Sequence, residues 1–451
     1  MDMRAFFYRA VSGIYFSLKG SRYLQISRCL ERSQWWDPKR IQQFQNEELH
    51  KLIEYVYEYV PYYRKIMQER KLKPGDIKTT EDITKFPVLS KDLLRKYLNQ
   101  LISTQNNSIK KYIRRTGGST GEPLQIINDY TNSVWENAAF YRGFNFAGYQ
   151  RGDKIISLFG GTLGLAPEGK IDKLKTKFSG TVFLPAFEIS HQNINKYVNE
   201  IKKSKAKFLR GYTSAIYLLA KLIDKSNITI PLIAVFPTAE TLQDFQREQI
   251  EKTFQCKVFD QYGCGECNSI AFECASHSGL HISDENVFLE VLKNKERVPN
   301  GEMGALTLTI LHNYAMPLIR YQNGDIVSLD KRPCLCGRGL SRISRIYGRA
   351  NDVLLSQNGE LISGAFIPHL FRNTDGIEQV QLIQEEKDEI ILKVVKGPKF
   401  SKEELTERIE ILHKYLGDVK VNVEYVSFIT TTPQGKLKSV ISKFGNSLLC
   451  K

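Results

Sequence analysis

A run of glycine and hydroxyl residues at positions 116–123, TGGSTGEP, has the composition of a phosphate-binding loop. Glycines let the backbone turn so that several N–H groups converge on one anion, and hydroxyl groups add further donors. The G-x-G-x-x-G spacing of a dinucleotide site is missing, and an ordinary flexible loop has a similar composition. The candidate phosphate-binding residues are Thr116, Gly117, Gly118, Ser119, Thr120 and Gly121.

A second glycine-containing segment, GLAPEGK at 164–170, matches the G-x-x-x-x-G-K pattern of nucleoside triphosphatases. In that pattern a hydroxyl residue follows the lysine and ligates Mg²⁺, whereas Ile171 stands there in this chain. Pro167 also removes one backbone N–H from the phosphate cradle. We therefore predict that this segment does not bind a nucleotide in that way.

Cysteines gather in one part of the chain, with five of the eight between residues 264 and 336, which favours metal ligation over a secreted disulfide framework. Three thiolates and one imidazole form the usual ligand set of a closed tetrahedral Zn²⁺ site, whose role is structural because no position is left for water. The expected ligands are Cys274, His281, Cys334 and Cys336. Rival ligands are His277 and Cys267, and buried free thiols are the alternative without metal.

The elements that must position these residues follow from the pattern of apolar residues. Residues 34–100 are predicted to be helical, with breaks at Pro61 and Pro87. From about residue 111, β-rich runs alternate with helical stretches, which predicts βαβ units around a mostly parallel sheet. The β-rich runs are 154–159, 181–186, 232–237 and 256–263.

Two further regions have different patterns. Strands within 287–330 follow one another without helices and predict an antiparallel or barrel-like subdomain. After Gly348 a strand pair, a helix from Ser401 to about Tyr415 and a last strand predict a small α+β lobe. The fold class expected is α/β, with a large multi-subdomain N-terminal domain and a small C-terminal lobe.

Further motifs follow the glycine-rich run in a fixed order: TAETL (238–242), DQYGCGE (260–266), RYQNGD (320–325), YGRAND (347–352) and TTPQGK (431–436). With VPYYR (60–64) and FPVLSK (86–91), they cover nearly the whole chain. This order resembles the adenylate-forming superfamily, in particular the phenylacetate–CoA ligase branch and its capsular-polysaccharide CapK relatives. The resemblance implies an AMP-binding domain over residues 1–347, helical over 1–110, and a mobile lobe over 348–451 after a hinge.

The resemblance also implies a role for each matching residue. Glu266 would ligate Mg²⁺ and act in catalysis, while Asp325 and Arg349 would bind the ribose. Lys436 would be brought by the mobile lobe to the substrate carboxylate and the α-phosphate, where its charge stabilises the transition state. The remaining assignments are nucleotide contacts by Glu240 and Tyr262 and a hinge at Asn351.

Several positions depart from the family pattern. Cys264-Gly265 stands where many members carry a hydroxyl residue before the glutamate, and Leu124 replaces a frequent lysine. The hinge residue is usually aspartate or lysine, although asparagine tolerates unusual backbone angles. Cys264 lacks an identifiable base, so we do not expect covalent catalysis by its thiol. The zinc ligand spacing is similar to that of zinc-containing members of the same branch.

The formal charge of +15 indicates attraction to anions, without identifying which, and we do not expect nucleic acid because the charge is spread along the chain. No stretch reaches the roughly 18 apolar residues that span a bilayer, and the N-terminus lacks a signal-peptide cleavage site, which predicts a cytoplasmic protein. Residues 1–22 combine apolar and basic residues. A helix packed on its own domain is the favoured interpretation, and peripheral contact with the inner membrane face is the alternative.

The function predicted is ATP-dependent adenylation of a carboxylic acid, followed by transfer of the acyl group to coenzyme A or another acceptor such as a sugar. The CapK resemblance implies a setting in capsular or surface polysaccharide biosynthesis. ATP, AMP, Mg²⁺, structural Zn²⁺ and coenzyme A are the cofactors this implies. The alternative is a catalytically weak nucleotide-binding protein that serves a polysaccharide assembly complex.

Overall fold

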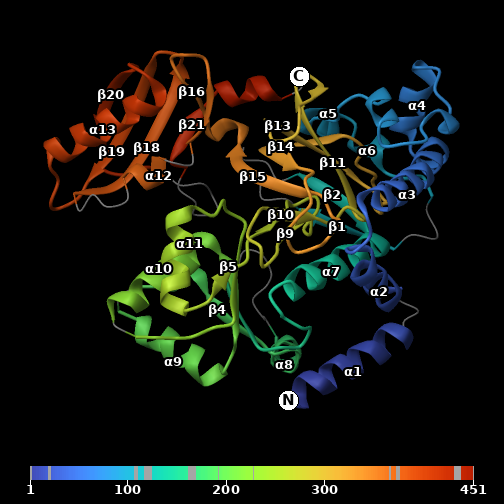
Figure 1. The fold of residues 1–451 in the computed structure, drawn as a ribbon, viewed down its shortest axis with the longest axis horizontal. Helices are drawn as coiled ribbons and strands as arrows, with labels where there is room; N and C mark the ends of the chain where they lie inside the picture. Colours follow the sequence, from blue (N-terminus) through green and yellow to red (C-terminus); the bar gives the residue numbers. More distant parts are fainter. Residues whose placement is uncertain are drawn as a thin grey trace.

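The computed structural model describes residues 3–18, 22–105, 110–115, 124–160, 169–190, 192–226, 228–364, 367–371, 376–430 and 438–449. These residues form a mixed α/β fold, as the sequence predicted (Figure 1). The helices are α1 (Met3–Leu18), α2 (Tyr23–Ser33), α3 (Pro38–Tyr59), α4 (Pro61–Glu69), α5 (Lys91–Lys96), α6 (Leu98–Leu101), α7 (Tyr130–Asn145), α8 (Lys170–Ser179), α9 (Ile194–Ser204), α10 (Thr213–Lys225), α11 (Asp244–Phe254), α12 (Ile367–Leu370) and α13 (Lys402–Leu416).

The strands fall into five sheets. They are β1 (Lys111–Arg115), β2 (Gln125–Asp129), β3 (Ile155–Phe159), β4 (Thr181–Pro185), β5 (Phe208–Tyr212), β6 (Ala234–Thr238), β7 (Lys257–Val258), β8 (Gln261–Tyr262), β9 (Ala271–Glu273), β10 (Leu280–Ile282), β11 (Val287–Lys293), β12 (Glu296–Arg297), β13 (Met303–Ile310), β14 (Tyr321–Asp330), β15 (Arg342–Arg349), β16 (Val353–Leu355), β17 (Leu361–Ser363), β18 (Ile377–Glu386), β19 (Glu389–Lys396), β20 (Lys420–Tyr425) and β21 (Val440–Ser442).

A five-stranded parallel sheet in the order β4-β3-β5-β6-β7 carries the middle of the chain. Every residue of β3 is buried, as a parallel strand covered on both faces requires. The apolar faces of α9, α10 and α11 pack against this sheet and share one core with it (Figure 1). This confirms the βαβ units predicted from the alternating pattern.

An eight-stranded antiparallel sheet in the order β12-β11-β13-β14-β15-β10-β9-β8 carries the next part of the chain. Its long central strands, β13 and β14, are almost entirely buried. Apolar residues of α3, α4, α5 and α6 share a core with the sheet. The N-terminal helical region therefore covers this sheet, and the break expected at Pro61 separates α3 from α4.

The run at 256–263, predicted as one strand, is divided between two sheets. Residues 257–258 form β7 at the edge of the parallel sheet, and residues 261–262 form β8 at the edge of the antiparallel sheet. Asp260, between them, donates its backbone N–H to Glu273, which also accepts from Arg247 at 2.9 Å. Burial raises the pKa of Asp260 to about 7. These hydrogen bonds to Glu273 fix the chain at Asp260, where it passes from the parallel sheet into the antiparallel sheet.

The C-terminal lobe has its own core. Its four-stranded sheet, in the order β20-β19-β18-β21, is antiparallel at the centre and parallel at both edges. Leu405, Leu412 and Leu416 of α13 pack against it. The boundary predicted at 347/348 falls within the last residues of β15, and the first element after that strand is a 3₁₀ turn over residues 350–352.

Candidate active site

The candidate site is built around a charged pair on two neighbouring strands. Asp325 of β14 lies directly opposite Arg349 of β15 in the antiparallel register. Arg349 Nε lies 2.8 Å from Asp325 Oδ1, and Arg349 Nη1 donates to the Asn323 carbonyl at 2.9 Å. The Asp325 charge raises the pKa of Arg349. Because the Arg349 side chain is still 41% exposed, the guanidinium remains open to a ligand.

The second oxygen of Asp325 is held by two further donors. Tyr262 donates its hydroxyl to Asp325 Oδ2, and Asn323 donates Nδ2 to the same oxygen at 2.7 Å. Asn323 Nδ2 also reaches the Tyr262 hydroxyl at 2.9 Å. Burial, with the Asp325 charge, raises the pKa of Tyr262 well above its usual value, so the hydroxyl remains a donor. Asp325 is thus a fixed, buried carboxylate.

Glu266 lies in a tight turn beside this group. The backbone N–H groups of Cys264 and Cys267 donate to each other's carbonyls at 2.8 and 3.1 Å, which closes the turn around Glu266. The Tyr321 hydroxyl donates to Glu266 Oε1 at 2.6 Å. Burial, and next the Glu266 charge, raises the pKa of Cys264 well above its usual value. A protonated, buried Cys264 thiol fits the expectation that it is not a nucleophile.

Lys91 also lies close to Arg349, Glu266 and Asp325, a position that was not predicted from the sequence. Leu89 pairs with β14 by donating to the Arg320 carbonyl at 2.9 Å and accepting from the Gln322 N–H at 3.0 Å. Ser90 then caps α5, so Lys91 begins the helix at the edge of the site. Burial, together with Arg349, lowers the pKa of Lys91, while the charges of Glu266 and Asp325 oppose this change.

Gly324 leaves room between Lys91 and Arg349, the two positively charged side chains of the site. A methyl group placed there would lie 3.8 Å from Lys91 Nζ and 3.9 Å from Arg349 Nη1. The backbone φ of +86° at Gly324 also favours glycine. Lys91 and Arg349 therefore converge over one turn of the chain, with Glu266 close by. The motif FPVLSK was the available signal for Lys91, but only the pairing of Leu89 with β14 places it here.

Glu240 lies at the neighbouring edge of the parallel sheet. It follows β6, and its Oε2 accepts from the Ser214 N–H at 2.8 Å at the start of α10. Ala239 before it has a φ of +67°, a strained value for a residue with a side chain. The carboxyl ends of parallel strands are where such folds bind ligands. Glu240 is thus held at that edge, apart from the Asp325 group.

The glycine-rich run, residues 116–123, and Lys436 lie outside the described residues, as do residues 161–168 of the second glycine-containing segment. The strands on either side of residues 116–123 are described: β1 and β2 pair antiparallel, with Arg115 opposite Gln125. Lys438 is described too, and it lies near enough to Asp352 for its charge to lower the pKa of that carboxyl, although burial raises it overall. Asn351, the expected hinge residue, is exposed in the 3₁₀ turn after β15.

Glu136 of α7 connects the β1–β2 hairpin to the turn that carries Glu266. Its buried carboxylate accepts from Arg114 of β1 at 2.7 and 3.2 Å. The same carboxylate accepts from the backbone N–H of Asn268 at 3.3 Å. Nothing in the sequence signalled this residue, because Arg114 and Asn268 are far apart along the chain. Glu136 therefore fixes the two candidate phosphate-site elements relative to each other.

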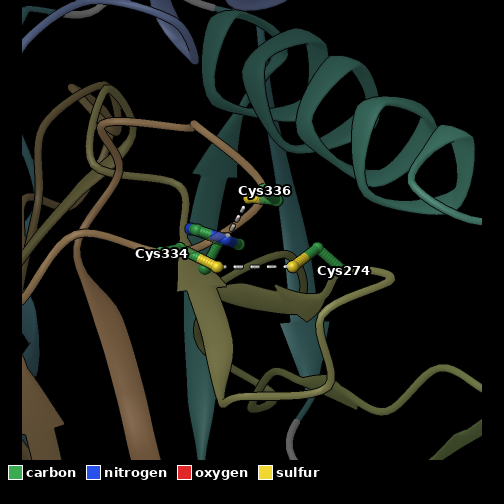
Figure 2. Close-up of side chains that lie close together, drawn as sticks. Cys274, Cys334 and Cys336 are labelled. Atoms are coloured by element: carbon green, nitrogen blue, oxygen red, sulfur yellow. Dashed lines mark hydrogen bonds between the residues drawn. The ribbon is translucent and has the colours of Figure 1, made fainter.

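The four cysteine and histidine residues predicted as zinc ligands lie together. Their donor atoms are all within 4.8 Å of one another, with Cys274 Sγ 3.7 Å from Cys334 Sγ and His281 Nε2 3.2 Å from Cys336 Sγ. Figure 2 shows the sulfur atoms of the three cysteines turned toward a common centre. Cys274 follows β9, His281 lies in β10, and both other cysteines lie between β14 and β15. The cluster thus joins three parts of the antiparallel sheet.

His281, rather than the rival His277, completes this cluster. His281 Nδ1 lies 3.3 Å from the Leu340 carbonyl, an arrangement in which the protonated Nδ1 donates and Nε2 is left to bind a metal. Burial lowers the pKa of His281 to about 4, which keeps the ring neutral. His277 instead faces Glu273 at 3.2 Å. Among the described residues Cys267 is also outside the group that could hold a metal.

Comparison with known proteins supports the same fold and family. Residues 354–443 match the family model described as the CapK C-terminal domain. Protein CapK of Staphylococcus aureus is 28% identical over 412 residues, which cover 89% of each chain. Phenylacetate–coenzyme A ligase of Thermus thermophilus is 27% identical over 331 residues, covering 70% of this chain and 72% of that one.

Solved structures of CoA ligases have the same arrangement of elements. A 2-hydroxyisobutyryl-CoA ligase in the postadenylation state superposes with a TM-score of 0.72 at 20% identity, over 92% of each chain. The same ligase in its thioesterification state gives a lower TM-score of 0.61. The fold is therefore that of the adenylate-forming CoA ligases. Along most of its length the chain is similar to CapK and to the phenylacetate–CoA ligases, which confirms the resemblance inferred from the ordered motifs.

The position of Glu136 generates a prediction about local stability. We expect Glu136→Ala to increase amide hydrogen exchange in both residues 111–115 and the turn at 264–268, because Arg114 and the Asn268 N–H lose their shared acceptor. The matched control is Asn137→Ala, an exposed neighbour on the same helix. Hydrogen exchange followed by mass spectrometry measures both variants. Equal protection of the two segments in wild type and Glu136→Ala would contradict the connecting role.

Proposed function

We propose that this protein uses ATP and Mg²⁺ to adenylate a carboxylic acid and then transfers the acyl group to coenzyme A or another acceptor. The observation that carries the proposal is the convergence of Asp325, Arg349, Lys91 and Glu266 beside strands β14 and β15, with the Arg349 side chain still partly exposed. A fixed carboxylate can accept from ribose hydroxyls, while two cations and a carboxylate that can ligate Mg²⁺ suit a triphosphate. Few other ligands combine these needs.

The ribose-binding role of Asp325 and Arg349 follows from their hydrogen bonds. Tyr262, Asn323 and Arg349 hold the Asp325 carboxylate in one orientation, and a carboxylate has more acceptor positions than these three donors use. A prepositioned acceptor loses little conformational entropy when the nucleotide binds. Glu240, at the adjacent sheet edge, is the further nucleotide contact that we propose.

Several parts of the N-terminal domain would bind the phosphates, among them the turn that carries Glu266. When bound, Mg²⁺ would offset the charge of the triphosphate, with Glu266 as its protein ligand. Lys91 would donate to phosphate oxygens from the opposite side of Gly324. The run from Thr116 to Gly121 would add backbone donors, held in place through β1 by Glu136.

The proposed chemistry has two steps. A carboxylate oxygen attacks the α-phosphorus of ATP, so that an acyl–adenylate forms and pyrophosphate leaves. The thiol of coenzyme A, or a sugar hydroxyl or amine, then attacks the acyl carbon and AMP leaves. Lys436 would stabilise the charge on the α-phosphate in the first step. Support for its location comes from Lys438, whose charge acts on Asp352, three residues beyond Arg349.

The setting that we propose is capsular or surface polysaccharide biosynthesis, supported by the similarity to CapK along 89% of the chain. In that setting, the acceptor of the acyl group would be either a sugar or coenzyme A. The second candidate function is a nucleotide-binding protein with weak catalysis. The specific observation that favours it is the buried, protonated Cys264 at a position where many family members carry a phosphate-binding hydroxyl.

We also propose that Cys274, His281, Cys334 and Cys336 bind one Zn²⁺ in a structural role. Three thiolates and a neutral imidazole are a suitable donor set, and the four donor atoms already surround one point. When bound, the ion would hold the segment after Glu266 to the β14–β15 connection. It would thus stabilise the sheet that carries Asp325 and Arg349 without taking part in the reaction.

Exchange of pyrophosphate into ATP tests adenylation directly. With a panel of carboxylic acids, we expect wild-type exchange with at least one acid and a loss of about 10²–10³-fold in Lys436→Ala, because a charge that stabilises the transition state is removed. Lys420→Ala, which removes an exposed lysine from the same lobe, is the control. ATP binding without exchange for any acid would refute adenylation and favour the binding-protein alternative.

Lys91 gives a separate prediction about ATP binding. We expect Lys91→Met to raise the KM for ATP in the exchange reaction about tenfold or more, since a charge-assisted hydrogen bond contributes about 1.5–3 kcal/mol. Lys96→Met, at the exposed end of the same helix, should leave the KM unchanged. An unchanged KM in Lys91→Met would show that this side chain does not contact the nucleotide.

Metal analysis tests the zinc proposal. Purified wild type should contain about one Zn²⁺ per chain, whereas Cys336→Ser should contain much less and should unfold at a lower temperature. A loss of even about 2 kcal/mol would lower the Tm by roughly 4 °C or more. Cys29→Ser, a half-buried thiol outside the cluster, is the control. Wild type that is metal-free but equally stable with and without added zinc would contradict the proposal.

A further inference from the structure

The exposed side chains of α1 that the structure describes, between Met3 and Ile14, are all apolar. Met3, Phe6, Phe7, Val11 and Ile14 are each between 50% and 73% exposed. The sixth exposed position is Ala10. Positions 3, 7, 11 and 14 lie on one stripe of a helix. A surface helix of a globular domain normally turns such a stripe inward, so the orientation of this stripe is an inversion, although Ala5, Tyr8 and Phe16 do pack on the domain.

The polar residues of α1 explain the inversion, because they hold the helix to the domain. Arg4 donates to the carbonyls of Phe178 at 2.9 Å and Gly152 at 2.7 Å. Arg9 lies 3.4 Å from the Asp153 carboxylate and donates to the Arg151 carbonyl at 3.4 Å. Helix α1 is thus packed on its own domain, the interpretation that the sequence favoured. The arginines pack inward together with Tyr8 and Phe16, whereas Phe6 and Phe7 are exposed.

Helix α8 extends the apolar face. It lies beside α1 at the edge of the molecule (Figure 1), and Tyr8 of α1 contacts the Phe178 ring edge to face at 5.4 Å. Leu174 and Phe178 of α8 are 68% and 40% exposed. The α1–α8 face, defined as Met3, Phe6, Phe7, Val11, Ile14, Leu174 and Phe178, is thus a continuous feature of two helices rather than a single exposed side chain.

The charge around the α1–α8 face is positive. From Met3 to Leu30 the chain has five basic residues and no acidic one. On α8, Lys175 and Lys177 are exposed, and Asp172 lies 3.5 Å from Lys175. The exposed, described side chains of α1 also offer no hydrogen-bonding group. A protein partner would therefore find no directional contact on this helix, whereas a lipid bilayer requires none.

We propose that the α1–α8 face binds the surface of a bilayer containing anionic lipids. The phenylalanine, methionine and isoleucine side chains would enter the boundary between headgroups and acyl chains, and the exposed Lys175 and Lys177 would attract the lipid phosphates. α1 would lie in the plane of the membrane. Of the helices in the described residues, none is long and apolar enough to cross a bilayer. This proposal is independent of the proposed enzymatic activity.

Sedimentation with vesicles tests the proposal. The full-length protein should bind vesicles of phosphatidylcholine mixed with phosphatidylglycerol, and binding should fall at high salt. The double variant Phe6→Ser/Phe7→Ser should lower the partition coefficient at least about tenfold, because two rings lose their apolar contacts. Phe428→Ser, which removes an exposed ring from the C-terminal lobe, should bind like wild type. Circular dichroism verifies that each variant is folded.

A second measurement tests the proposal with a variant that should still bind the vesicles. In Phe7→Trp, the tryptophan emission should shift to shorter wavelength when phosphatidylglycerol vesicles are added, beyond any shift of the wild type. Failure of wild type to bind the mixed vesicles, or an unchanged emission in Phe7→Trp, would overturn the proposal. So would a wild-type dimer that becomes a monomer in the double variant, since a second copy would then be the occupant of this face.

Discussion

The ion pair between Asp325 and Arg349 is the interaction on which the candidate site depends. It joins directly opposed residues of β14 and β15, and Tyr262, from β8 at the far edge of the same sheet, donates to the same carboxylate. Because Arg349 is the last residue of β15, the pair also fixes the point from which the C-terminal lobe departs. One charged contact therefore links the proposed ribose-binding residues to the start of the second lobe.

The parts that could be predicted are those with a local pattern or an ordered motif. Alternating strands and helices predicted the parallel sheet, and consecutive strands predicted the antiparallel one. The motifs around Glu266, Asp325 and Arg349 come from three separate segments, and the fold brings those residues to one place. The four metal-ligand candidates also lie together. Their spacing in the sequence could only suggest this, because it is the pairing of β9, β10 and β15 that brings Cys274 close to Cys334.

Other features depend on contacts that no local pattern encodes. Lys91 reaches the site only because Leu89 pairs with β14, and Glu136 connects partners that lie more than a hundred residues apart. The division of 256–263 between two sheets depends on buried polar bonds at Asp260. Packing of α1 on its own domain was predicted, but the exposure of its apolar stripe was not, because periodicity identifies an apolar stripe but not what covers it.

The way the C-terminal lobe is attached suits a two-step reaction. Among the described residues, the core shared by its sheet and helix includes no residue of the N-terminal domain, so the movement that we expect of the lobe would not expose that core. The cluster that joins the lobes is small, with Ala350, Val353 and Leu448 packed on Ala305 and Ile326. Asp352 accepts from the Arg349 N–H at 3.1 Å and so keeps the first turn aligned with β15. A rotation that begins beyond this hydrogen bond would leave Asp325 and Arg349 in place. The ribose contacts that we propose for these two residues would then serve both the adenylation and the transfer step.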